Sequence, residues 1–116
     1  MRNLKKMPEQ IAHQALHVLQ LEQAVANLKE AIAAEEAEID RAIAFSESYK
    51  NDAQRKAARS ELLEGDAELA QLRHQLKEAV AGAAKAEIEL TLLRNTFAIA
   101  KLEARERIAR TEALVA

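Results

Sequence analysis

Aliphatic residues recur at every seventh position along the N-terminal part of this chain: Leu4, Ile11, Val18, Val25, Ile32 and Ile39. Companion positions three residues later hold Met7, Leu21, Leu28 and Ala42. This heptad pattern is typical of a helix that packs along one seam against another helix. We therefore expect a long helix over about residues 8–45, with Pro8 in its first turn, where a missing N–H costs nothing.

The same period returns in the C-terminal half. Its two rows of seam residues are Leu69, Leu76, Ala83, Leu90 and Phe97, and then Leu72, Ala79, Ala86, Leu93 and Ala100. A second long helix is expected over about residues 66–112. Its middle reads AVAGAAKA from Ala79 to Ala86, so the small residues around Gly82 predict an unusually close approach of the two helices there.

Between the two heptad regions, the segment FSESYKND at residues 45–52 carries no heptad. Asn51, followed three residues later by Gln54, predicts an N-cap with a capping-box partner. The short helix that starts there is expected over about residues 52–63. Gly65 is predicted to end it in a left-handed conformation, and Asp66 to cap the next helix.

The composition supports this interpretation, since the 116 residues include 26 alanines, one proline and two glycines. Such a composition favours long helices and argues against turn-rich or all-β folds. The sequence thus predicts a single all-α domain over residues 1–116. Its architecture is an antiparallel helical hairpin, or coiled coil, with a short helix between two long helices.

Two polar residues, Gln14 and Glu35, interrupt the first seam. A polar residue in a helical core can fix register or select a partner, and Glu35 is a candidate for that role. Its acidic neighbours are Glu36, Glu38 and Asp40. On a helix these carboxylates diverge, so a solvated face is favoured over a cation cage or an acid–base pair.

A second set of apolar residues runs along another side of the C-terminal helix: Ile88, Leu92, Ile99 and Leu102. We call these four residues the outer stripe. A single partner helix cannot cover this stripe and the heptad seam together, so either the short helix or a second chain must pack on it. The second chain is preferred, and the protein is expected to be a homo-oligomer, a dimer or larger.

The formal net charge is -2, which gives no overall attraction to nucleic acid. Four cations nevertheless gather near the short helix, and we call them the basic cluster: Lys50, Arg55, Lys56 and Arg59. They could contact a phosphate backbone, although Glu61 and Glu64 lie nearby. A solvated or internally paired face is the preferred interpretation, and an acidic protein partner is a third.

His13 and His17 have the spacing of two metal ligands on one helix, but the intervening residues lack the glutamate of an HExxH motif. No third ligand is at hand, so solvated histidines are favoured and no metal site is predicted. His74 is expected to be an ordinary surface residue. No phosphate loop, nucleophilic triad or dinucleotide motif is found, so the sequence predicts neither an enzyme nor a cofactor.

No stretch has the roughly 20 apolar residues of a membrane span, and the basic start is not followed by a signal-peptide core. The absence of cysteine permits a reducing compartment. A cytoplasmic location is therefore expected.

A further pattern spans Lys50 to Phe97 and its flank, about half the chain. It consists of Asn51, Asp52, Arg55, Lys56, Leu62, Leu63, Asp66, Glu89, Leu90, Leu93, Arg94 and Phe97. In this pattern the chain resembles small helical proteins encoded in phages and prophages near recombination genes. The resemblance implies a phage product in the host cytoplasm, and it carries over no catalytic residue.

Taken together, the patterns predict a non-enzymatic helical interaction or oligomerisation module. The alternative is an accessory DNA-binding protein of phage recombination or DNA metabolism.

Overall fold

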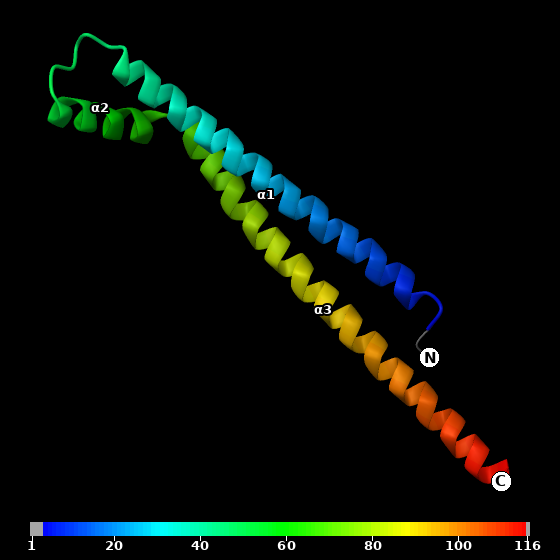
Figure 1. Cartoon of the computed structure of the whole chain (residues 1–116). Helices are drawn as coiled ribbons and strands as arrows, with labels where there is room; N and C mark the ends of the chain where they lie inside the picture. The colour runs from blue at the N-terminus through cyan, green and yellow to red at the C-terminus, as the bar shows by residue number, and fades with distance from the viewer. Residues whose placement is uncertain (1–3, 116) are drawn as a thin grey trace. The chain divides into compact units, whose positions relative to one another are not determined.

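The computed structural model describes residues 4–115. Within this range the chain forms three α-helices and no strand. The helices are α1 (Met7–Ala44), α2 (Asp52–Gly65) and α3 (Ala67–Val115). Stretches of α1 and α3 run side by side in opposite directions, and α2 lies between them in sequence (Figure 1). This confirms the predicted all-α hairpin with a short helix between two long ones. The helix ends lie within three residues of the expected limits.

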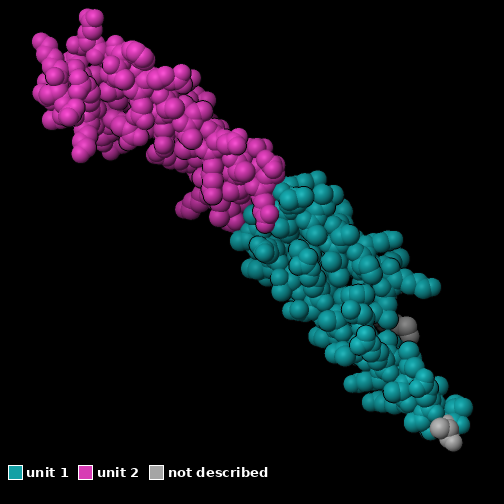
Figure 2. Space-filling view, viewed as in Figure 1, with its two compact units in different colours: residues 1–21, 82–116 teal, residues 22–81 magenta. Residues whose placement is uncertain are grey.

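The chain divides into two compact units (Figure 2). The first unit joins Met1–Leu21 to Gly82–Ala116, and the second is Glu22–Ala81. The outer stripe therefore lies wholly in the first unit. The basic cluster and the whole of α2 lie in the second, and each surface is described within its own unit.

In the first unit, α1 and α3 share a thin apolar core. Val18, Ala86 and Leu90 are buried together, and they are packed by the partly buried Ile11, Ala15 and Leu21. Five of these six residues are the predicted seam positions, apart from Ala15. One layer of side chains per heptad is what two antiparallel helices can bury, so the core is narrow.

Gln14 interrupts this core, and among residues 4–115 no buried side-chain nitrogen or oxygen lacks a hydrogen-bond partner. The Nε2 of Gln14 donates to the backbone oxygen of Ala86 at 2.9 Å and lies 3.4 Å from a carboxylate oxygen of Glu89. The amide thus ties one turn of α1 to one turn of α3. Every residue of α3 offers a backbone oxygen, so only the Glu89 carboxylate makes this contact depend on the register of the two helices.

In the second unit, Ile43, Ala58 and Leu69 are buried, one from each helix. The prediction that Ala42 follows Ile39 in the seam was wrong, because Ala42 is exposed and Ile43 is buried instead. A straight helix turns its buried face by about 20° per heptad. Near its end α1 also faces α2, as the contact between Asp40 and Arg59 records. Both effects move the buried face by one position.

The start of α2 follows the predicted capping pattern. Asn51 has an extended backbone, and its Oδ1 accepts a hydrogen bond from the backbone N–H of Gln54 at 2.9 Å. Gln54 in turn accepts from the backbone N–H of Lys50 at 2.8 Å. The bond from Gln54 confirms Asn51 as the N-cap. The predicted capping box is displaced by one residue, because the Gln54 side chain pairs with the backbone N–H of Lys50 and not with that of Asn51.

The junction between α2 and α3 differs from the prediction. Gly65 is the last residue of α2 and does not adopt a positive φ, so the left-handed ending was wrong. The chain turns at Asp66 instead, with φ -80° and ψ 104°. Its Oδ1 accepts from the backbone N–H of Leu69 at 3.0 Å, so Asp66 ends one helix and caps the next.

The expected close approach at Gly82 also needs correction. A Cβ atom added at Gly82 would meet no other atom within 4 Å, so no neighbouring helix requires a glycine at that position. The tight small-residue contact is made one turn later by Ala86, which is buried in the core of the first unit.

Candidate functional site

The four residues of the outer stripe are exposed on one side of α3. The exposed fractions are 70% for Ile88, 65% for Leu92, 48% for Ile99 and 57% for Leu102. Within residues 4–115, therefore, no helix covers this stripe. Of the two predicted alternatives, α2 does not pack on the stripe. The other alternative, a second chain, stays a prediction.

The opposite side of the same helix is already occupied. Ala86, Leu90 and Ala100 are buried, and they alternate along α3 with the exposed stripe residues. A surface helix of a soluble protein usually has one apolar side and one polar side. This part of α3 has two apolar sides and only one of them is covered.

Three polar residues continue the outer stripe in its own spacing. Asn95 lies between Leu92 and Ile99, Lys85 precedes Ile88 by three residues, and Glu106 follows Leu102 by four. Steps of three and four alternate along the whole row: Lys85, Ile88, Leu92, Asn95, Ile99, Leu102 and Glu106. All seven residues are exposed, so α3 carries a second complete heptad row with a polar centre and charged ends. We call this row the outer seam.

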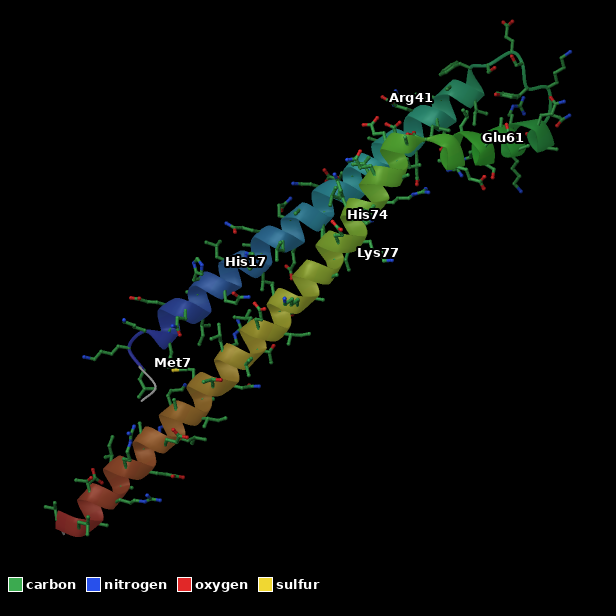
Figure 3. All side chains as sticks on the ribbon, turned by 180° about the vertical axis from the view of Figure 1, so that it is seen from behind. Met7, His17, Arg41, Glu61, His74 and Lys77 are labelled. Atoms are coloured by element: carbon green, nitrogen blue, oxygen red, sulfur yellow. The ribbon has the colours of Figure 1, made fainter. Side chains whose placement is uncertain are left out.

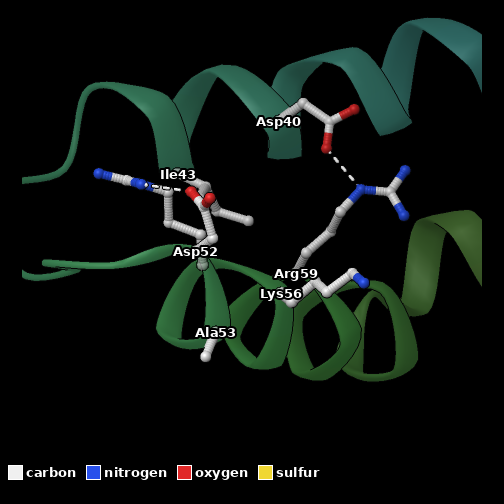
Figure 4. Close-up of a pocket in the computed structure, with 7 residues that line it drawn as sticks. Asp40, Ile43, Asp52, Ala53, Lys56 and Arg59 are labelled. Carbon is white, nitrogen blue, oxygen red and sulfur yellow. Dashed lines mark hydrogen bonds and ion pairs between the residues drawn. The ribbon is translucent and has the colours of Figure 1, made fainter.

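Part of the basic cluster lines an open groove between the end of α1 and the start of α2 (Figure 4). The groove has a volume of about 630 Å³, and Ile43 and Ala53 provide part of its wall. Three of the four cations border it: Arg55, Lys56 and Arg59. Lys50 is exposed in the preceding loop, where its backbone takes part in the cap of α2.

Two of these cations are paired with carboxylates. Arg59 Nε lies 2.6 Å from an Asp40 oxygen, and Arg55 lies 2.9 Å from an Asp52 oxygen (Figure 4). The hydrogen bond and the charge of Asp40 raise the pKa of Arg59 above its usual value. Among the described residues Lys56 has no such partner. The groove is therefore closer to charge balance than the row of cations in the sequence suggests.

A carboxyl pair stands at the junction of α1 with α3. A hydrogen bond with Asp66, partial burial and the negative charges of Asp66, Glu68 and Glu38 raise the pKa of Glu35 to about 7. The backbone N–H of Leu69 and the same carboxyl hydrogen bond lower the pKa of Asp66. Below about pH 7 the pair therefore holds one proton on Glu35, which then bridges α1 to the N-terminus of α3.

The histidines do not assemble into a site. His13 and His17 are exposed on α1, and His74 Nε2 lies 3.1 Å from Glu78 one turn along α3 (Figure 3). Within residues 4–115 no three histidine, cysteine or carboxylate side chains are grouped as metal ligands would be. Glu36 and Asp40, from the acidic run, pair instead with Arg73 and Arg59.

Sequence reasoning found the apolar part of the outer seam but missed Lys85, Asn95 and Glu106. The signal was present in the sequence, because the three residues continue the alternation of three and four. A search restricted to apolar residues passes over polar ones at the same spacing.

None of the helices in the described part of the chain combines the length and the apolar character that crossing a bilayer demands. The chain matches no known protein family, curated protein or solved structure.

Proposed function

We propose that this protein is a non-enzymatic helical interaction module that self-associates through the outer stripe. The observation that carries this proposal is the exposure of Ile88, Leu92, Ile99 and Leu102 along one side of α3, opposite a side that is already packed. A second helix that lies along the stripe would bury all four side chains in one row.

The size of the stripe sets the strength of association to expect. Full burial of one Leu or Ile side chain contributes roughly 1.5–3 kcal/mol. The stripe residues are about half to two-thirds exposed, so each can gain only about that share of this value. Four residues on each copy then contribute roughly 10 kcal/mol, against an association cost of about 4–15 kcal/mol. The difference leaves at most about 6 kcal/mol, so the expected complex has a dissociation constant of tens of micromolar or weaker.

The stripe is tested by replacing one of its residues and comparing the loss of self-association with that caused by the same substitution at a similarly exposed leucine outside the stripe. Leu92→Ser should weaken self-association roughly tenfold or more, because both copies lose an apolar contact. Leu19→Ser is the control, since Leu19 is 60% exposed and lies on α1 of the same unit. Sedimentation velocity over a concentration series gives both dissociation constants. Equal effects of the two substitutions would exclude the stripe as the interface.

Nucleic-acid contact through the basic cluster is the alternative function. The groove lined by Arg55, Lys56 and Arg59 supports it, since these cations stand on one helix within reach of a common backbone. The pairs with Asp40 and Asp52 weigh against it, because a phosphate would have to compete with carboxylates already in place.

A DNA titration at two salt concentrations tests this alternative. Binding that falls with salt, and that weakens in Arg55→Glu, would support a role for the basic cluster. Arg94→Glu, a charge reversal on an exposed residue of the other unit, is the control. Binding that is absent at low salt, or that both variants weaken equally, would remove the basic cluster as a specific contact.

A further inference from the structure

We propose that the occupant of the outer seam is the outer seam of a second copy, running antiparallel and centred on Asn95. This inference deepens the proposed function and rests on it. It assigns Asn95, Lys85 and Glu106 to the interface beside the four apolar residues. It also fixes the direction in which the second helix runs.

The outer seam is complementary to itself when it is reversed. Asn95 stands at its middle, with Ile88 seven residues before it and Leu102 seven after it. Reversal about Asn95 therefore brings apolar residues against apolar residues on both sides. It also brings the two Asn95 amides close together, where each can donate to and accept from the other. A polar residue at one core position is a common means of fixing the register of a helix pair.

The ends of the seam select the direction. Lys85 stands at one end and Glu106 at the other, and neither forms an ion pair in the described part of the chain. Antiparallel packing places Lys85 of one copy within about one helical turn of Glu106 of the other. Parallel packing in register places Lys85 against Lys85 and Glu106 against Glu106. Opposite charges thus meet in only one of the two arrangements.

The flanks of the seam permit close packing. One flank carries Ala84, Thr91 and Ala98 at intervals of seven, and small side chains let two helix backbones approach. The same flank continues to Arg105, which in the antiparallel arrangement lies level with Lys85 and beside Glu106. The other flank carries Glu89 and Glu103, which oppose each other in the antiparallel arrangement. The Glu89 carboxylate already accepts a hydrogen bond from the side-chain amide of Gln14. Salt also screens the repulsion between exposed charges on this flank. Lys85 and Glu106 occupy seam positions, which face the second helix more directly than the flanking positions do.

Charge reversal in the full-length protein distinguishes the two directions. Lys85→Glu should weaken self-association about tenfold at low salt, because it places like charges at both ends of an antiparallel pair. Combining Lys85→Glu with Glu106→Lys should restore the affinity, since the ends again carry opposite charges. In a parallel pair in register, Lys85→Glu would replace the repulsion between two lysines by a repulsion between two glutamates, so the affinity would change little. Lys77→Glu, on exposed α3 surface in the other unit, is the control.

Each outcome of the sedimentation series decides one of the two proposals. Loss of affinity in Lys85→Glu that the second substitution restores supports the antiparallel seam. A dimer that Leu92→Ser weakens but Lys85→Glu leaves unchanged overturns the antiparallel arrangement and leaves the proposed function standing. A wild-type chain that remains monomeric, or a dimer insensitive to Leu92→Ser, overturns the proposed function itself. Circular dichroism at matched concentration shows that the variants keep their helices.

Discussion

At the scale of single residues, the Glu35 and Asp66 carboxyls link folding of the second unit to protonation. The pKa of Glu35 is raised to about 7 in the folded chain by the hydrogen bond to Asp66, partial burial and nearby carboxylates. A raised pKa contributes stability that is complete below the ordinary value near 4.5 and is lost as the pH rises through about 7. The lowered pKa of Asp66 acts in the opposite sense, and its contribution is lost only in more acidic solution.

The substitution Glu35→Gln should remove this dependence. A glutamine amide can donate to Asp66 at every pH, so the variant should resist urea better than wild type at pH 8 and about equally at pH 5. The urea midpoint of unfolding at the two pH values measures the effect. Glu87→Gln, on an exposed residue of the first unit, should keep the wild-type pH dependence. An unchanged pH dependence in Glu35→Gln would show that the carboxyl pair does not hold a proton.

Leu69 is the residue whose truncation should cost the most stability. It has no exposed surface, and it follows directly on the cap that Asp66 provides. Replacing a buried Leu by Ala costs about 2–5 kcal/mol through lost transfer energy and the cavity left behind. Leu69→Ala should therefore lower the free energy of unfolding by about that amount in a urea titration. Leu62→Ala, at a half-exposed position of α2, should cost clearly less, and equal losses would contradict the burial of Leu69.

At the scale of elements, the short helix α2 depends on its cap. It has 14 residues, and Ala58 is its one buried position among those described. Helices of this length are marginal without outside contacts, so the hydrogen bond from Gln54 to Asn51 is a large part of what holds the first turn. In the loop before α2, the backbone N–H of Ser46 donates to Ile43 and that of Ser48 donates to the Ser46 hydroxyl, so these two bonds do not reach α2.

Asn51→Ala should loosen the first turn of α2. Loss of an N-cap costs about 1 kcal/mol, which corresponds to roughly fivefold faster opening of the amides at residues 52–55. Hydrogen exchange followed by mass spectrometry measures this rate. Ser60→Ala, at an exposed position in the middle of α2, should leave exchange unchanged. Equal exchange in both variants would mean that tertiary contacts, and not the cap, hold the turn.

The sequence predicted the elements well and their contacts less well, for a physical reason. Heptads and caps are local patterns, so the order of residues alone was enough to identify the seams and the caps at Asn51 and Asp66. The pairs Arg59–Asp40 and Glu35–Asp66 join residues far apart in the chain, and nothing local encodes them. The conformation of Gly65 was predicted wrongly because Asp66 alone can end one helix and begin the next.

At the scale of the whole molecule, the account rests on a helix with two apolar sides. The inner side of α3 is packed within the chain, and the outer side is uncovered over Ile88, Leu92, Ile99 and Leu102. The sequence alone could identify this excess of apolar surface. The apolar spacing alone does not identify the occupant of this surface, because that depends on the polar residues in the same row. Only the symmetry of Lys85, Asn95 and Glu106 about the middle of the row points to another copy.

The molar mass of the wild-type chain in solution tests this claim most directly. Sedimentation equilibrium between about 5 and 300 µM spans the range in which a complex of moderate affinity forms. Self-association through the outer stripe predicts a mass that rises with concentration from 12.9 kDa towards twice that value. A mass of 12.9 kDa at every concentration would contradict it, since the outer stripe would then remain exposed without a second copy.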